Sequence, residues 1–406
     1  MSLREVFLEG LGELASSIHL PAETWRAYAA SMATPNTVVE LTGTYGVAKT
    51  TLALGTMKVF FGDVYSQPVR PIVRLRETLT EFDVFWYLSV RAMMSDDEER
   101  EVRPRPIVTS PFKFFNEARR GSPRVYQLML SLLSEGELEY RGRTYRSEPF
   151  FCVLDSNPRD AASHEMPKAL ADRVDARIPV GVPDPLTAAG VVSERAGRWR
   201  SPVDGLETVM ESADMKRVWA ETSAVEFPEQ CALLLSFVHA ALQCARRYTV
   251  PLWAAGEEVE VDRTLTEGGF QLLCDQCGFK GSLCSRVAEV WGIRWMISAA
   301  RLAVGMAWLD GRGRASLRDV AAALPYVLNH RLVLRDGAAY PNTFTFLRLY
   351  IPAMLRVSGQ NWAEAAVLAA RALSGDEEAL DGLASVASRD PAVALLASAV
   401  RRRLGG

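Results

Sequence analysis

Apolar runs alternate with polar stretches along the chain, and two of these runs flank a glycine-containing stretch that begins at residue 43. Residues 38–41 form an apolar run that predicts a buried strand, and residues 52–61 form a second apolar run of helix-forming residues. The stretch between them reads Gly43, Thr44, Tyr45, Gly46, Val47, Ala48, Lys49, Thr50 and Thr51. A strand, a glycine loop ending in Lys-Thr and a helix, in this order, predict a phosphate-binding loop.

The loop residues have the chemistry that a phosphate site needs. Backbone N–H groups in the loop and at the helix N-terminus point at phosphate oxygens. Lys49 adds a mobile positive charge for the β- and γ-phosphates, and the Thr50 hydroxyl is a ligand for Mg²⁺. The strict pattern G-x4-G-K-S/T has Gly where Ala48 stands. Ala is the smallest replacement for Gly, and Gly46 still allows the loop its tight turn, so we interpret the stretch as a phosphate-binding loop. A chance glycine-rich helix start is the alternative.

A second strand, at residues 111–115, ends on Asn116 and Glu117. A nucleotide hydrolase needs a carboxylate at such a strand end, where it polarises a water for in-line attack. Glu117 fits that role. Asn116 stands where an Asp normally helps to hold the Mg²⁺ shell. Its amide can bond a metal-bound water but adds no charge, so we expect weaker metal binding. The alternative is a surface Asn-Glu pair at a helix start.

Further apolar runs at residues 71–76, 150–154 and 174–180 predict more strands, and helical patterns separate them. Predicted strands and helices therefore alternate along this part of the chain. Residues 137–146 alternate around Arg-Gly, which predicts a hairpin. An aromatic group at residues 82–87, beside a charged run and two prolines, predicts an exposed insertion and not core; a packed surface hairpin is the alternative.

Composition narrows the class of protein. The 406 residues are 49% hydrophobic and 23% charged, with a formal net charge of -3, so no global positive field attracts nucleic acid. No apolar stretch is long enough to span a membrane, and the N-terminus lacks a signal pattern. We therefore expect a cytoplasmic protein.

Three of the six cysteines lie close together, as Cys274, Cys277 and Cys284. The C-x2-C spacing lets two thiolates reach one tetrahedral Zn²⁺, so these three are candidate zinc ligands. No fourth ligand is obvious nearby, although Cys231, Cys244 and His239 are candidates. Buried inert thiols, or a disulfide, are the alternative.

The order of these parts resembles the AAA+ ATPases and, within them, the MoxR family. The family loop G-x-P-G-x-A-K-T has Ala before Lys, as Ala48 stands here, with Tyr45 in place of its Pro. The family strand end D-E-I-N-R is similar to residues 116–120, with Asn116 in place of the family's Asp. The pre-sensor hairpin segment of the family is similar to residues 130–140.

Two later motifs carry the same resemblance. The family segment A-T-x-N-P is similar to residues 154–158, which implies that Asn157 is the sensor-1 residue. The segment L-P-E-A-x-L-D-R-F is similar to residues 166–174, which implies that Arg173 is an arginine finger acting on a neighbour's nucleotide. The resemblance resumes at residues 291–332 and implies that Arg294 is the sensor-2 arginine; a solvated lid arginine is the alternative.

The resemblance implies N-terminal helices at 1–35 and an α/β AAA+ P-loop domain, with a parallel sheet between helices, at 36–182. It also implies an all-helical lid at 183–335. The lid holds a Cys-containing insertion at 249–285, and extra C-terminal helices follow at 336–406. It also implies an ATP hydrolase with Mg²⁺, a homo-oligomeric ring, usually a hexamer, and chaperone-like work on a protein complex. Such proteins often act with a partner that contains a von Willebrand factor A domain.

Two other functions remain open at this point. The chain could be an ATP-gated scaffold that turns over slowly or not at all, because Asn116 weakens the metal site. It could also remodel nucleic acid, since Arg141, Arg143 and Arg146 lie on the predicted hairpin. The pI of about 6.0 argues against nucleic acid.

Overall fold

The structure is a computed structural model that describes residues 1–88, 102–157, 165–197, 201–242, 286–334, 342–357, 359–388 and 391–405. The chain divides into two compact units. The first comprises Met1–Glu226 and Val304–Arg314, and the second comprises Phe227–Ala303 and Ala315–Gly406. The predicted division into four segments is finer than this and stays a prediction.

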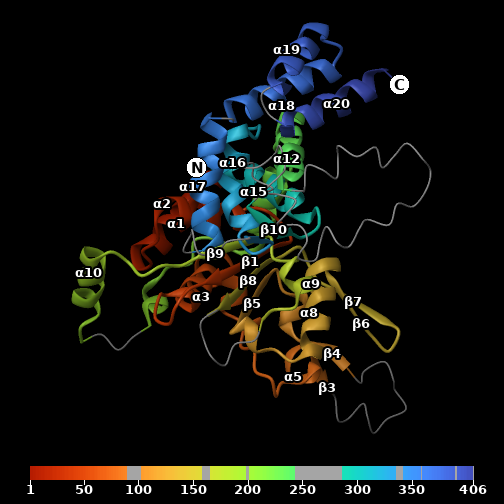
Figure 1. Ribbon diagram of the computed structural model, residues 1–406. Coiled ribbons are helices and arrows are strands. Elements are labelled where there is room, and N and C mark those ends of the chain that lie inside the picture. The colour runs from red at the N-terminus through yellow and green to blue at the C-terminus, as the bar shows by residue number, and fades with distance from the viewer. Residues whose placement is uncertain are drawn as a thin grey trace. The chain divides into compact units, whose positions relative to one another are not determined.

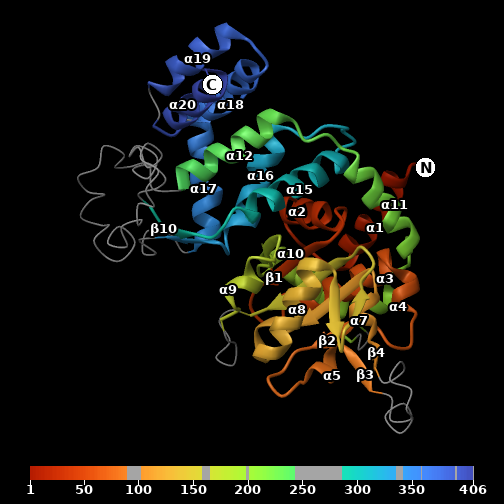
Figure 2. The same ribbon diagram turned by 90° about the vertical axis from the view of Figure 1, so that its right-hand side faces the viewer.

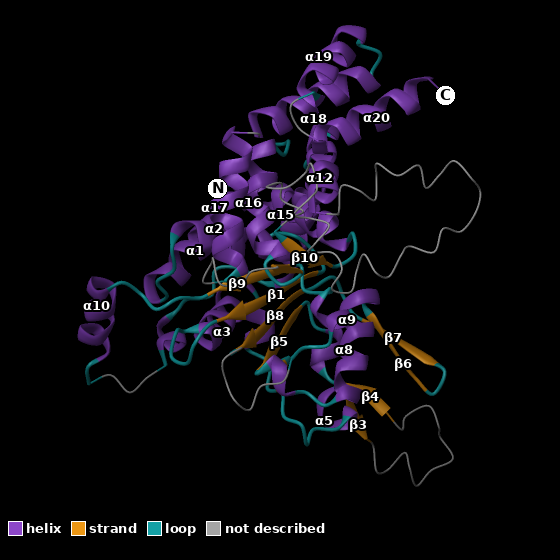
Figure 3. Ribbon diagram, viewed as in Figure 1, coloured by secondary structure: helices purple, strands orange, loops and turns teal. Residues whose placement is uncertain are grey.

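A five-stranded parallel sheet forms the centre of the first unit, with the order β2-β5-β8-β1-β9. Figure 3 shows these strands in orange. All six residues of β1 and all six of β8 are buried, as expected for central parallel strands covered on both faces. The predicted α/β class is therefore confirmed. The strands are β1 (Thr37–Thr42), β2 (Ile72–Arg74), β5 (Phe112–Asn116), β8 (Phe151–Ser156) and β9 (Ala176–Pro179).

Helices lie against this sheet (Figure 1). Helix α2 contacts β1 and β9, and α3 contacts β5 and β8. Local signals set their ends: α8 begins after the capping Ser122 and ends at Gly136, whose φ is 70°. The helices are α1 (Leu3–Ser17), α2 (Ala22–Met32), α3 (Lys49–Phe60), α4 (Gly62–Tyr65), α5 (Glu81–Val84), α7 (Pro106–Thr109), η2 (Ala118–Arg120), α8 (Pro123–Glu135), α9 (Lys168–Ala171), α10 (Pro185–Arg195), η3 (Pro202–Gly205) and α11 (Ser212–Ser223).

Two small antiparallel ribbons accompany the sheet. The predicted hairpin is present as β6 (Glu137–Tyr140) and β7 (Arg143–Arg146), joined by Arg141 and Gly142 at φ 49° and 76°. The other ribbon pairs β3 (Trp86–Leu88) with β4 (Val102–Pro104). The expectation of an exposed aromatic insertion is wrong for Trp86, which is buried and packs on Tyr140 and Tyr145 of the hairpin. The hairpin, which is distant from Trp86 in the sequence, covers its ring.

The second unit is mainly helical, as predicted for the lid and the C-terminal part (Figure 2). Its short β10–β11 pair joins residues about forty positions apart and was not predicted. The elements assigned to it are α12 (Glu229–Leu242), β10 (Val287–Val290), α16 (Leu317–Leu328), β11 (Leu332–Leu334), α17 (Thr343–Val357), α18 (Gly359–Leu373), α19 (Glu377–Ala387) and α20 (Pro391–Gly405), and α15 (Arg294–Leu309) contributes residues to both units. Within the described ranges, no helix is long and apolar enough to cross a bilayer.

Candidate functional site

The glycine loop connects the end of β1 to the start of α3, and its backbone explains its residue types. A Cβ on Gly43 would lie 2.3 Å from the carbonyl oxygen of Val180, so only glycine fits there. Gly46 has φ 77°, which favours glycine. Ala48 also has a left-handed backbone, with φ 64°. The strict pattern places Gly at this position, and this backbone conformation explains that preference.

Lys49 and Thr50 follow as the first residues of α3, with their side chains toward the loop. The Lys49 ammonium donates to the carbonyl oxygens of Gly43 and Thr44, each at 2.7 Å. Burial lowers the pKa of Lys49, and the nearby carboxylate of Asp155 opposes that shift. The Thr50 hydroxyl donates to Oδ2 of Asp155 at 2.8 Å. The loop therefore presents one cation and one hydroxyl to the same space.

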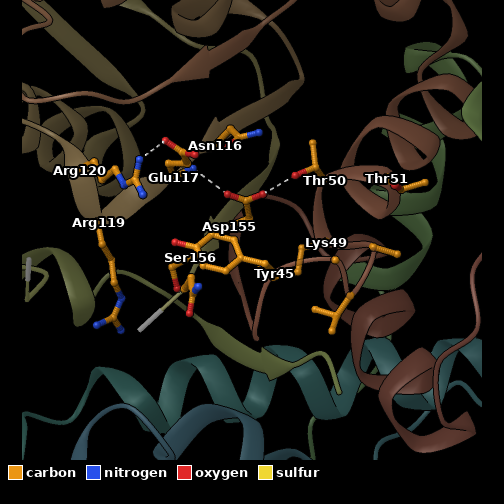
Figure 4. Close-up of a pocket in the computed structure, with 14 residues that line it drawn as sticks. Tyr45, Lys49, Thr50, Thr51, Asn116, Glu117, Arg119, Arg120, Asp155 and Ser156 are labelled. Carbon is orange, nitrogen blue, oxygen red and sulfur yellow. Dashed lines mark hydrogen bonds and ion pairs between the residues drawn. The ribbon is translucent and has the colours of Figure 1, made fainter. Parts of the chain in front are cut away.

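Asp155, near the end of β8, is the functional residue that sequence reasoning missed. Its Oδ1 accepts the backbone N–H of Glu117 at 2.7 Å, while Oδ2 accepts from Thr50. Figure 4 shows the carboxylate between these two partners. Burial raises the pKa of Asp155, and the two hydrogen bonds oppose that shift. The signal was a carboxylate two positions before Asn157, near the end of a buried strand.

Glu117 follows the end of β5 with a left-handed backbone, φ 56°. Its carboxylate accepts from Arg120 at 3.1 Å, which holds the acid beside the pocket. Asn116, the last residue of β5, is buried and also lines the pocket. A carboxylate that follows the end of a strand therefore lines the cavity, and its action on a water stays a prediction.

A buried ion-pair network lies behind the pocket. Glu40, in the middle of β1, is fully buried and accepts from Arg177 at 2.6 Å and from Arg119 at 3.3 Å. The Ser156 hydroxyl donates to the same carboxylate at 2.6 Å. Burial alone would raise the pKa of Glu40, but the two arginines and Ser156 together lower it. This network fixes Arg119 and Ser156, which both line the pocket.

These side chains surround a cavity of about 290 Å³, near the lower end of the range for small-molecule pockets. Of the predicted residues, Tyr45 to Thr51, Asn116, Glu117 and Asn157 line it. Hydroxyl, amide and carboxylate oxygens are the donors that Mg²⁺ prefers, so the donor set of Thr50, Asn116 and Asp155 fits that ion. The lining residues are Tyr45, Gly46, Val47, Ala48, Lys49, Thr50, Thr51, Asn116, Glu117, Arg119, Arg120, Asp155, Ser156 and Asn157.

Other predicted residues lie outside the described lining of this cavity. Arg173 contacts the Ser134 hydroxyl and, at 3.3 Å, the Asp172 carboxylate. Arg294 is the first residue of α15 in the second unit, and its role stays a prediction. Cys274, Cys277 and Cys284 lie outside the described residues. Among residues that are described, no cluster of three His, Cys, Asp or Glu side chains forms a metal site.

Two family models and several known proteins match this chain. Residues 39–174 match the family model of the AAA domain (dynein-related subfamily), and residues 288–343 match that of the AAA lid domain. Protein MoxR of Methylorubrum extorquens is 26% identical over 73% of this chain and 78% of its own. Protein MoxR of Paracoccus denitrificans is 27% identical over 73% and 79%. Chaperone MoxR1 of Mycobacterium tuberculosis is 26% identical over 74% and 68%.

A solved structure supports the fold independently. A crystal structure of a candidate ATPase from Cytophaga hutchinsonii superposes with a TM-score of 0.64. It covers 87% of this chain and 94% of that one, at 18% identity. At this identity the likeness concerns the fold alone.

Proposed function

Because the chain belongs to the MoxR family of AAA+ ATPases, we propose that it hydrolyses ATP with Mg²⁺ in a ring of identical subunits and uses the cycle to remodel a protein complex. One observation carries the proposal. The phosphate loop, the strand-end acid Glu117 and the polar residue Asn157 line a single cavity, although they come from separate parts of the chain.

Each part of the cavity has a task in this proposal. The loop N–H groups and the start of α3 bind the phosphates, and Lys49 neutralises charge on the outer two. The Thr50 hydroxyl and the neighbouring oxygen donors would hold Mg²⁺, which supplies charge neutralisation when bound. Glu117 orients the attacking water, and Asn157 contacts the γ-phosphate. Arg120 sets the position of the Glu117 carboxylate.

Arg173 supports the idea of a site shared between subunits. Its side chain is 23% exposed and lies outside the described lining of its own cavity. An arginine that stabilises transition-state charge from a neighbouring subunit must be held near the surface of its own subunit. Subunits that each donate Arg173 to the next form a head-to-tail contact, which closes as a ring. We propose a hexamer, with Arg294 as the lid arginine.

The work on a protein complex rests on family membership and on one relative being named a chaperone. A partner with a von Willebrand factor A domain belongs to the same proposal. Zinc at Cys274, Cys277 and Cys284 and a cytoplasmic location stay predictions.

Mixing two inactive variants tests the shared site. Glu117→Gln removes the acid and Arg173→Ala removes the finger, so each alone should lose most ATP hydrolysis. In mixed rings, about one quarter of the sites would combine an intact Glu117 with an intact neighbouring Arg173. We expect phosphate release to recover to a similar fraction. No recovery on mixing, in assemblies shown to exchange subunits, would contradict an arginine supplied by a neighbour.

A further inference from the structure

Two strand-end positions of the cavity differ from the family patterns in opposite ways. By resemblance, the family pattern D-E-I-N-R places Asp where this chain has Asn116, and A-T-x-N-P places Thr where it has Asp155. We propose that Asp155 is the carboxylate that holds Mg²⁺ in this protein, in place of the residue at 116. This inference rests on the proposed ATP site.

Strand pairing puts the two positions side by side. Strands β5 and β8 are parallel neighbours, and Phe115 on β5 is the partner of Leu154 on β8. The next residues along these strands are Asn116 and Asp155, at the same level of the sheet. The negative charge has therefore moved one strand sideways, toward β1 and the phosphate loop, because β8 lies between β5 and β1.

The contacts of Asp155 place its charge against the expected metal ligand. Its Oδ2 lies 2.8 Å from Oγ1 of Thr50. In octahedral Mg²⁺ coordination with metal–oxygen distances near 2.05 Å, adjacent ligand oxygens are about 2.9 Å apart. The two oxygens are thus spaced as two neighbouring ligands of one ion would be. The other carboxylate oxygen is fixed by the N–H of Glu117, so the group is held in place.

The charges around the cavity also favour Asp155 over Glu117 as the carboxylate that binds Mg²⁺. Among the described residues that line the cavity, the carboxylates are Glu117 and Asp155. Glu117 forms an ion pair with Arg120 and is 36% exposed in its side chain. Asp155 is 4% exposed, and the positive charge of Lys49 acts on its carboxylate. A buried carboxylate beside a phosphate loop is costly unless a cation compensates it, and Mg²⁺ would do so.

Nucleotide binding with and without metal tests this assignment without depending on turnover. The dissociation constant of a fluorescent ATP analogue is measured with Mg²⁺ in excess and again with EDTA, for wild type and Asp155→Asn. We expect wild type to bind at least about tenfold more weakly in EDTA, and the isosteric Asp155→Asn to lose most of that difference. A Mn²⁺ titration in the presence of ATP should show the same loss of metal affinity in Asp155→Asn. Binding is followed by the decrease in the electron paramagnetic resonance signal of free Mn²⁺.

Two further variants separate position from charge. Glu117→Gln removes the same charge from the same cavity and should keep the metal dependence of wild type. Asn116→Asp combined with Asp155→Asn returns the charge to β5 and should restore metal dependence. Thermal melting confirms that each variant is folded. If Asp155→Asn alone is unstable, the combined variant still tests the assignment, because a folded double variant without metal-dependent binding would contradict it.

The outcomes for the proposed function and for Asp155 are distinct. If wild type binds no ATP analogue in either condition, the proposed ATP site itself fails. If wild type binds with clear metal dependence and Asp155→Asn retains all of it, the ATP site stands and the assignment of Asp155 is overturned. An equal loss in Glu117→Gln would also overturn it, because the effect would then be general electrostatics.

Discussion

Replacement of Glu40 by Gln tests whether the buried network behind the cavity stabilises the first unit. The carboxylate is fully buried between Arg177 and Arg119, with the Ser156 hydroxyl as a third partner. The amide keeps the shape but turns one acceptor into a donor that faces an arginine. Removing one partner of a buried ion pair costs about 3–5 kcal/mol, because the remaining charge is left uncompensated.

The assay is urea denaturation at pH 7, followed by circular dichroism and tryptophan fluorescence. Glu137→Gln is the matched control, because it breaks an ion pair with Arg146, whose side chain is 82% exposed. Exposed pairs contribute about 0–1 kcal/mol, so the control should unfold close to wild type. If Glu40→Gln and Glu137→Gln cost the same, within about 1 kcal/mol of wild type, the reasoning about burial is refuted.

The same variant has a pH signature. The pKa of Glu40 is lowered in the folded state, so its carboxylate stabilises the fold above the ordinary value near 4.5. That contribution is lost as the pH falls through the lowered folded pKa. The difference in unfolding free energy between wild type and Glu40→Gln should therefore shrink below pH 4.5 and stay constant above about pH 6.

Three further predictions concern the loop and the sheet. Gly43→Ala should lower the unfolding free energy by about 1–3 kcal/mol and weaken nucleotide binding, because the added Cβ would clash with the carbonyl oxygen of Val180. An unchanged melting temperature and an unchanged nucleotide affinity would contradict this prediction. Ala48→Gly should raise the unfolding free energy by up to about 1 kcal/mol, because it relieves the left-handed backbone, whereas Ala48→Val should lower it in the same urea titration. Lys113 donates to three backbone carbonyls, and burial lowers its pKa to about 7. Between pH 7 and 10 the folded chain then binds fewer protons than the unfolded chain, so its unfolding free energy should rise with pH by up to about 1.4 kcal/mol per pH unit relative to that of Lys113→Met. A difference in unfolding free energy that does not change with pH would contradict the lowered pKa.

The sequence predicted those parts of the site that depend on local pattern. The phosphate loop was predicted because its strand, glycines and Lys-Thr are contiguous, and the structure brings Lys49 and Thr50 to the cavity. Glu117 was predicted because an acid at the end of an apolar strand is also a local signal. The hairpin at residues 137–146 was predicted from its Arg-Gly turn, where both residues have positive φ.

The parts that were missed depend on which strands lie side by side. Asp155 has a partner in Thr50, more than one hundred positions away, and only the order of β5, β8 and β1 brings them together. Trp86 was expected in an exposed insertion, but Tyr140 and Tyr145 of the hairpin cover it. Hydrophobic periodicity and composition report local structure, so they could predict neither the contact of Asp155 with Thr50 nor that of Trp86 with the hairpin. Both contacts arise from packing between segments that are distant in the sequence.

The central claim is that this cavity hydrolyses ATP through Glu117, and phosphate release by purified protein with saturating ATP and Mg²⁺ tests it most directly. We expect steady turnover by wild type and a loss of at least about a hundredfold in Glu117→Gln, which keeps the size of the side chain and the binding of nucleotide. Equal rates of phosphate release in the two proteins would contradict the account.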